Sequence, residues 1–174
     1  MADVRLVDES NEKEFVDYMS SQNYRWFNRG KKHSLQHKYK NYIGWTLLYD
    51  NNKIVAFAGM QHFKYLDNTV RVCTRLYYDP SIRYQYTYST KNNIITPVTP
   101  LMLFQLKYLQ DSEYDTAVAT LENHRGKKFM EYMARNLNKK IGTNFLPHEK
   151  PIQTFEGQNE KDYQWYMTHR LKEC

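Results

Sequence analysis

The feature that most constrains the fold is a block of three β-strand patterns between residues 44 and 78. Residues 44–49 and 54–63 are rich in β-branched and aromatic side chains, and the turn residues Asp50-Asn51-Asn52-Lys53 separate them, which is typical of a β-hairpin. Residues 69–78 alternate in side-chain type and end at Asp79-Pro80, so they predict a third strand. This block predicts an antiparallel sheet that helices must cover.

The segments on either side of the block supply those helices. Residues 4–8 predict a short strand, and a capping pattern at Asn11 predicts a helix that extends to about residue 23. After Thr99-Pro100, residues 101–110 are almost wholly apolar and are expected to form a buried helix. Residues 84–96, which precede it, are expected to form a long loop or an extended excursion.

The last third of the chain predicts a buried strand over 116–121, an amphipathic helix over 126–138 and two terminal strands, near Gln153 and over 163–171. This order predicts one domain, residues 1–174, of α/β (α+β) class, with a central mixed, mainly antiparallel sheet flanked by helices. We expect strand 69–78 to lie beside both 54–63 and 116–121, the latter in parallel across the apolar helix. A doubly wound dinucleotide fold is excluded.

The amino-acid composition limits the classes of ligand and the cellular compartment that we expect. The 25 Lys and Arg residues exceed the 19 Asp and Glu residues, and this positive charge favours an anionic cofactor or acceptor, including DNA or RNA. The 16 tyrosines suit a binding surface, although Lys- and Tyr-rich proteins are also typical of AT-rich genomes such as those of many phages. With only two cysteines, no apolar membrane-length stretch and no leader-like start, we expect a cytoplasmic protein that contacts no membrane, in the host cytoplasm if phage-encoded.

The chain resembles the GNAT superfamily of N-acetyltransferases over roughly residues 1–171. The resemblance rests on the hairpin 45–59, on Thr74-Arg75-Leu76-Tyr77-Tyr78-Asp79-Pro80-Ser81-Ile82-Arg83, and on the strand–helix unit 116–137. In that family, a V-x-P-x-x-R pattern leads into a glycine-rich loop whose backbone amides bind the pyrophosphate of acetyl-CoA at a helix N-terminus. Tyr78, Pro80 and Arg83 match the lead-in, so the resemblance implies an acyltransferase that uses acetyl-CoA or another acyl donor.

The loop itself departs from the family pattern. Tyr86 and Tyr88 stand where the family has small residues, and their side chains are expected to obstruct a close approach of backbone to phosphate. The sequence therefore predicts weak binding of ordinary acetyl-CoA. The loop is rebuilt around Arg83, Lys91 and the helix start at Thr99, or the donor is different, or there is none.

The resemblance implies a general acid on the helix that follows strand 116–121, commonly a tyrosine. Tyr132 is the candidate, although an alternative register places Met130 there. Glu122 is the candidate base, with solvent exposure as the alternative. The residues expected to contact the cofactor are the lead-in Arg83 and, near the start of the same helix, Asn123, Arg125 and Lys127. The alternatives are that Asn123 simply caps the loop and that Arg125 and Lys127 form a solvated positive face.

Two further groups of residues are candidates for contact with an acceptor or a nucleic acid. Arg71 and Arg75 lie on one face of the predicted strand 69–78, and they require an anion, a carboxylate partner or solvent. Residues 25–32 interleave basic and aromatic side chains, as nucleic-acid surfaces do, or they simply anchor a loop; the candidates are Arg25, Trp26, Arg29, Lys31 and Lys32. His33 and His37 have helical metal-ligand spacing without a third ligand, so no metal site is expected.

Together these patterns predict a GNAT-like acyltransferase that moves an acyl or aminoacyl group to an amine or hydroxyl acceptor, a modified phage DNA being one candidate. The alternative is a non-catalytic GNAT-like module that binds nucleic acid or protein through its basic, tyrosine-rich surface. The oligomeric state is left open.

Overall fold

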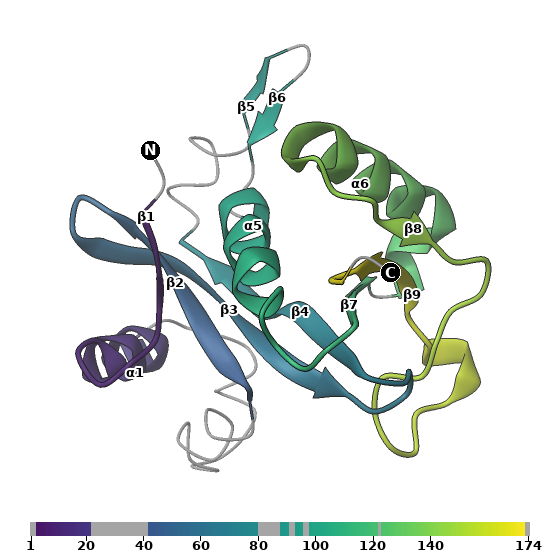
Figure 1. Ribbon diagram of the computed structural model, residues 1–174, viewed down its shortest axis with the longest axis horizontal. Helices are drawn as coiled ribbons and strands as arrows, with labels where there is room; N and C mark the ends of the chain where they lie inside the picture. The colour runs from purple at the N-terminus through teal and green to yellow at the C-terminus, as the bar shows by residue number, and fades with distance from the viewer. Residues whose placement is uncertain are drawn as a thin grey trace. The chain divides into compact units, whose positions relative to one another are not determined.

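The computed structural model describes residues 3–21, 42–79, 88–90, 93–95, 98–121 and 123–172. Its main sheet has seven strands in the order β1-β2-β3-β4-β7-β9-β8 (Figure 1). The strands are β1 (Asp3–Leu6), β2 (Gly44–Asp50), β3 (Lys53–Phe63), β4 (Thr69–Tyr78), β7 (Thr116–Leu121), β8 (Leu146–Pro147) and β9 (Trp165–Arg170). The helices are α1 (Glu12–Ser21), α5 (Val98–Leu109) and α6 (Gly126–Ile141), with 3-10 turns at Asn123–Arg125 and Glu160–Asp162.

The predicted sheet is confirmed. β4 lies between β3 and β7, and it runs parallel to β7 with Thr69 opposite Thr116 and Arg71 opposite Val118. The pairs β1–β2, β2–β3, β7–β9 and β8–β9 are antiparallel. At the hairpin between β2 and β3, Asn51 and Asn52 have φ values of 51° and 63°, which suit asparagine and a tight hairpin turn.

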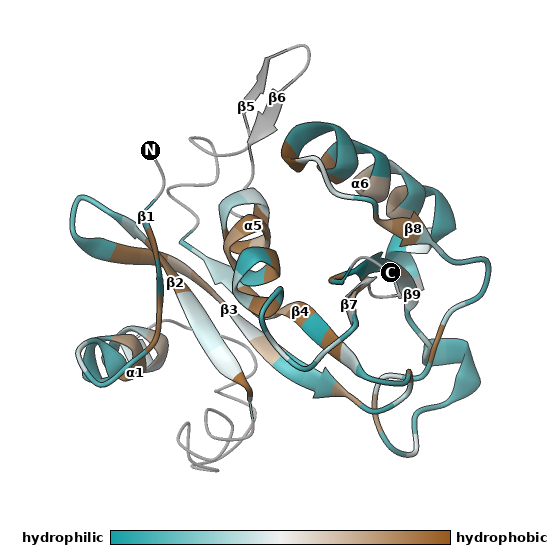
Figure 2. Cartoon of the chain, in the orientation of Figure 1, coloured by the Kyte–Doolittle hydropathy of each residue, from teal (hydrophilic) through white to brown (hydrophobic). Residues whose placement is uncertain are grey.

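Two compact units divide the chain. The first contains Met1–Gln61 and Cys73–Gln105, and its strands β2 and β3 are covered on both faces. Phe15 and Met19 of α1 pack with Trp45, Leu47 and Phe57. The alternate side chains Leu48, Val55, Ala56 and Ala58 pack with Leu101 of α5, which Figure 2 shows as mainly hydrophobic. The period of two along each strand therefore places α1 and α5 on opposite faces of β2 and β3.

β4 departs from the regular alternation expected of it. Cys73 and Arg75 have φ values of 50° and 52°, in the left-handed region that residues with a side chain rarely adopt. As a result Cys73, Leu76 and Tyr78 all pack with the cluster that contains Leu101, whereas Tyr77 packs with the cluster on α1. Regular alternation over residues 69–78 would place Cys73 and Leu76 on opposite faces, and this part of the prediction is wrong because of the two left-handed residues.

The second unit contains His62–Val72 and Leu106–Cys174. Its α6 buries Met130, Ala134 and Leu137, and it ends at Gly142, whose φ of 69° forms a left-handed C-cap with an N–H bond to the carbonyl of Asn138. The Asn138 side chain then holds the chain that leads to β8, because its Oδ1 accepts from the Phe145 N–H at 2.7 Å and its Nδ2 donates to the Phe145 carbonyl at 2.9 Å.

Two predicted segments differ in detail from the structure. Residues 84–96 contain a two-stranded hairpin, β5 (Tyr88–Thr90) and β6 (Asn93–Ile95). The penultimate strand is β8 at Leu146–Pro147, and the region near Gln153 contributes a single bridge between Ile152 and Gln164. A strand of two residues has no periodicity to detect. Among the described residues, no helix is long and apolar enough to cross a membrane.

Candidate functional site

A row of polar side chains lies on one face of the sheet in the second unit. Cross-strand register brings them together, because Arg71 is opposite Val118, Val118 is opposite Thr168, and Thr120 is opposite Tyr166. We call this row the polar face; its residues, all half-buried, are Arg71, Thr120, His148, Gln164, Tyr166 and Thr168.

The Arg71 guanidinium is held by two neutral neighbours on this face. Its Nη2 donates to Thr120 Oγ1 at 2.6 Å and to Gln164 Oε1 at 3.0 Å, and its Nε donates to Thr120 Oγ1 at 3.1 Å. Gln164 is fixed in turn by backbone bonds to Ile152 in both directions. These bonds place a cation with a defined orientation beside the β7–β9 ladder.

His148 and Tyr166 form the other end of the polar face. The two rings stack at 4.3 Å between centroids with 9° between their planes, and His148 Nε2 lies 2.8 Å from Thr168 Oγ1. Burial lowers the pKa of His148 from its ordinary value of 6.5 and raises the pKa of Tyr166. At neutral pH the face thus offers an uncharged imidazole that can accept a proton and a phenol that can donate one.

α6 packs against β9 on the opposite face of the sheet. The ring of Phe145, which the α6 residue Asn138 holds, lies 5.3 Å from that of His169 with 39° between their planes. His169 alternates with Thr168 along β9. The predicted acid Tyr132 is on the outer side of α6, 40% exposed, two positions beyond the buried Met130. Tyr132 is therefore accessible to a ligand, whereas Met130, 1% exposed, is part of the core.

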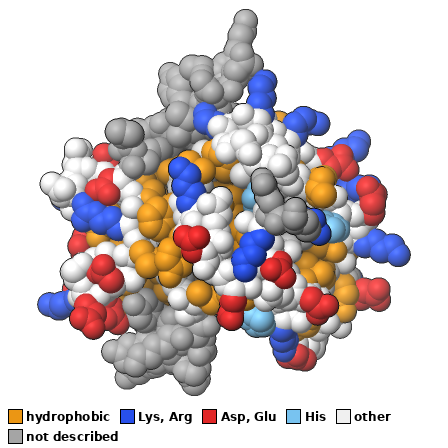
Figure 3. All heavy atoms as spheres, in the orientation of Figure 1, with side chains coloured by type: hydrophobic (Ala, Val, Ile, Leu, Met, Phe, Trp, Pro, Cys, Tyr) orange, Lys and Arg blue, Asp and Glu red, His pale blue; other side chains and the backbone are white. Residues whose placement is uncertain are grey.

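The predicted cofactor contacts near the start of α6 differ in their surroundings. Lys127 is ion-paired with Glu149 and lies 3.9 Å from Glu131, so two carboxylates already offset its charge. Arg125 is exposed and lies 5.3 Å above the ring of Phe129. In Figure 3, blue side chains project from the surface where α6 lies in Figure 1, with red ones among them.

The structure describes the remaining predicted site residues to different extents. Arg75 belongs to the first unit, is exposed and donates from Nε to the Tyr42 hydroxyl at 3.1 Å. Only the backbone of Asn123 is described, at the start of its 3-10 turn. The following lie outside the described residues: Arg25, Trp26, Arg29, Lys31, Lys32, Arg83, Tyr86 and Glu122, together with His33 and His37.

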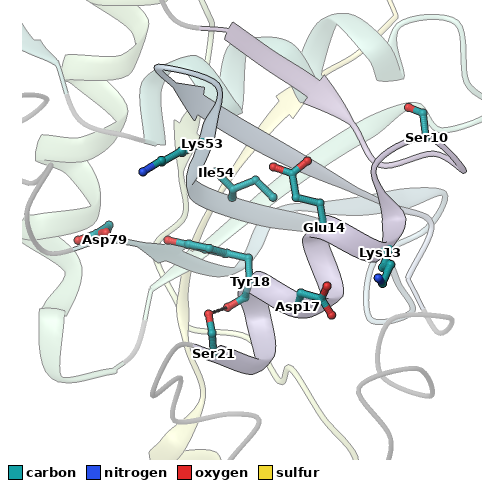
Figure 4. A pocket seen from close by; sticks show the side chains of 9 residues that line it. All are labelled: Ser10, Lys13, Glu14, Asp17, Tyr18, Ser21, Lys53, Ile54 and Asp79. Atoms are coloured by element: carbon teal, nitrogen blue, oxygen red, sulfur yellow. Dashed lines mark hydrogen bonds between the residues drawn. The ribbon is translucent and has the colours of Figure 1, made fainter.

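A pocket of about 790 Å³ lies in the first unit beside α1 (Figure 4). Its lining carries three carboxylates, Glu14, Asp17 and Asp79, and two ammonium groups, Lys13 and Lys53. Tyr18 points its hydroxyl toward Asp79 in this view, and burial raises its pKa. None of the residues predicted from the sequence to act in catalysis or cofactor binding lines this pocket.

The irregular part of β4 is tied to α5 by a buried side chain. Gln105 is 0% exposed, and its Oε1 accepts from the Cys73 N–H at 2.8 Å while its Nε2 donates to Thr46 Oγ1 at 2.9 Å. Left-handed conformations at non-glycine residues persist where surrounding contacts hold them, and they concentrate at functional sites. Burial raises the pKa of the Cys73 thiol to about 12, so Cys73 is no nucleophile at neutral pH.

Nothing in the described ranges resembles a metal centre: no three His, Cys, Asp or Glu side chains come together there. The chain also matches no protein-family model and no curated protein at a significant level.

Solved structures do match, over nearly the whole chain. A GNAT-family acetyltransferase from Staphylococcus aureus is 15% identical, with 99% of this chain and 100% of the other covered and a TM-score of 0.57. A GNAT-family N-acetyltransferase of Escherichia coli, solved with CoA, is 13% identical, with 98% and 82% covered and a TM-score of 0.58. The spermidine N-acetyltransferase of Vibrio cholerae, solved with CoA and spermine, is 11% identical, with 98% and 95% covered and a TM-score of 0.55.

The chain therefore has the fold of the GNAT N-acetyltransferases, as the order of its predicted elements indicated. The sequence did not reveal the part of the polar face that β8 and β9 supply. Gln164, Tyr166 and Thr168 alternate along one strand, which is a usable signal, but His148 follows a two-residue strand and becomes recognisable only through its contacts with Tyr166 and Thr168.

Proposed function

We propose that the protein transfers an acyl group from an acyl-CoA thioester to an amine. The observation that carries this proposal is the match of the fold to GNAT acetyltransferases over 97–100% of the chain. Two of the matching structures contain CoA, and one also contains an amine, spermine. The positive net charge of +6 suits the phosphates of such a donor.

The proposed roles follow the residues predicted from the sequence. Tyr132 is the candidate donor of a proton to the leaving CoA thiolate, and its exposure supports access to a ligand. Arg125 contacts the donor phosphates together with Arg83 and Asn123; Lys127 contributes less because Glu131 and Glu149 already pair with it. Glu122 remains a candidate base. Arg71 contacts the acceptor.

We propose an amine as the acceptor. A hydroxyl group or a modified DNA is the alternative acceptor. The DNA alternative depends on the basic, aromatic residues 25–32 and on the high tyrosine content. It predicts binding that weakens steeply with salt.

Thermal unfolding in the presence of acyl-CoA tests the donor. A ligand at about 100 times its dissociation constant stabilises by about 2.7 kcal/mol, which for a chain of 174 residues raises the melting temperature by roughly 5–10 °C. We expect this shift with a saturating acyl-CoA and none with adenosine. Replacing Tyr86 and Tyr88 by glycine should tighten acetyl-CoA binding, because both side chains are expected to block the phosphate loop. The absence of a shift with every acyl-CoA tested would contradict the proposed donor.

A further inference from the structure

We propose that His148 is the base that takes the proton from the amine acceptor, and that the acceptor binds at the polar face. This inference rests on the proposed acyl transfer and adds a residue that the sequence pattern did not suggest.

Three contacts fix the imidazole of His148. Its backbone N–H donates to the Tyr166 carbonyl at 3.0 Å, its ring stacks on the Tyr166 ring, and its Nε2 lies 2.8 Å from Thr168 Oγ1. When Nε2–H donates to Thr168, the lone pair of the imidazole is on Nδ1. Within the described part of the chain, Nδ1 has no hydrogen-bond partner, so this nitrogen remains available to a substrate.

The surroundings keep this imidazole uncharged before the reaction. Burial is the cause of its lowered pKa, and the titratable group in contact with it, Tyr166, has a raised pKa and stays neutral. Glu149, the next residue, is ion-paired with Lys127 of α6. Arg71, on β4 and therefore two strands from the Tyr166 strand β9, is the charged member of the polar face. An unprotonated imidazole is the form that can remove a proton.

The acceptor ammonium gives one proton to His148 Nδ1, and its nitrogen lone pair then forms a bond to the thioester carbonyl carbon. The nitrogen then gives its second proton to solvent, the carbon–sulfur bond breaks, and the leaving CoA thiolate takes one proton from solvent. His148 finally releases its proton to water. The products are the amide, CoA and one proton.

Two histidines provide a matched comparison: His148, which directly follows β8, and His169, which is part of β9. His148→Gln keeps a side chain that can bond Thr168 but cannot take a proton. His169→Gln changes a second half-buried histidine with a burial-lowered pKa, on the opposite face of β9, where its Nδ1 accepts from the Asn144 N–H at 3.2 Å. The full-length protein and both variants are compared by CoA release from acyl-CoA with a panel of primary amines, across pH values that span the imidazole and amine pKa values.

We expect His148→Gln to lower kcat/KM by roughly 10²–10⁴-fold, the range for loss of a general base. Its remaining activity should rise with pH toward the pKa of the amine, because only the free amine can react. His169→Gln should keep the pH profile of the unmodified protein. A folded His148→Gln variant with unchanged kcat/KM and an unchanged pH profile would overturn the assignment while leaving acyl transfer intact.

A milder variant keeps the inference testable if His148→Gln does not fold. Thr168→Val preserves the side-chain shape and removes the bond that orients the imidazole, so kcat should fall and the acidic limb of the profile should move while KM for the acyl-CoA stays constant. No change in this variant would overturn the role of His148. A wild-type protein that releases no CoA with any amine would overturn the proposed function itself, and the inference with it.

Discussion

Replacing Gln105 by methionine should destabilise the protein far more than its small change in volume suggests. Gln105 is fully buried on α5, and it joins three strands of the first unit. Its Oε1 accepts from the Cys73 N–H at 2.8 Å, and its Nε2 donates to Thr46 Oγ1 at 2.9 Å and, at longer range, to the carbonyls of Ala58 and Gly59 at 3.3 and 3.4 Å.

The magnitude follows from the two short bonds. Each contributes a net stabilisation of about 0.5–1.5 kcal/mol, and a part-buried N–H left without a partner costs about 1–3 kcal/mol. The Ala58 carbonyl retains the Thr46 hydroxyl as a donor at 3.1 Å, so Cys73 is the residue left with an unsatisfied group. Gln105→Met should therefore lower the free energy of unfolding by about 2–4 kcal/mol, which corresponds to a drop in melting temperature on the order of 5–15 °C.

Urea unfolding followed by circular dichroism measures this difference. Lys107→Met is the matched control, because it makes the same replacement on the exposed side of the same helix and should change stability by less than about 0.5 kcal/mol. If Gln105→Met were as stable as Lys107→Met, the argument that Gln105 holds the left-handed residues of β4 would be refuted.

Four further outcomes are expected. Tyr132→Phe should lower turnover by roughly 10²–10⁴-fold without changing the melting temperature, and unchanged turnover would remove Tyr132 from the mechanism. Gly59→Ala should cost about 1–3 kcal/mol, because its Cβ would lie 3.0 Å from Thr74 Oγ1 and 3.0 Å from Tyr42 Cδ1. Gly44→Ala should cost less in urea unfolding, because its Cβ would meet the flexible end of Met60 at 3.1 Å and Leu6 Cδ1 at an ordinary contact distance of 3.6 Å. Stability should fall as pH drops below 6.5, because His148 and His169 bind protons more readily when unfolded, and a double glutamine variant should flatten this dependence in melting curves. Finally, if the chain binds DNA, replacing Arg29, Lys31 and Lys32 together should weaken low-salt binding in a filter assay, and salt-insensitive retention would argue against a nucleic-acid surface.

Long periodic elements were predictable from the sequence alone. The strands at Thr69–Tyr78 and Thr116–Leu121 match their predicted bounds, and their parallel pairing followed from the apolar helix between them. Helix α6 begins at Gly126 as predicted and extends to Ile141, because the left-handed stop is supplied by Gly142 rather than by Asn138.

Features that depend on contacts between distant residues were not predictable. The left-handed conformations at Cys73 and Arg75 have no local cause in the sequence, since neither residue is glycine, and the contact with Cys73 comes from Gln105 on a later helix. A short strand such as β8 is defined by its partner β9 and not by its own pattern. For the same reason His148 could not be recognised before its neighbours were known.

The most direct test of the account is a product assay on the unmodified full-length protein. The protein is incubated with a series of acyl-CoA thioesters and primary amines, the released CoA thiol is measured, and the amines are examined by mass spectrometry. The account predicts that at least one pair yields CoA and the corresponding amide in equal amounts, at a rate that depends on protein concentration. Folded protein that releases no CoA above the uncatalysed rate with any pair would contradict it.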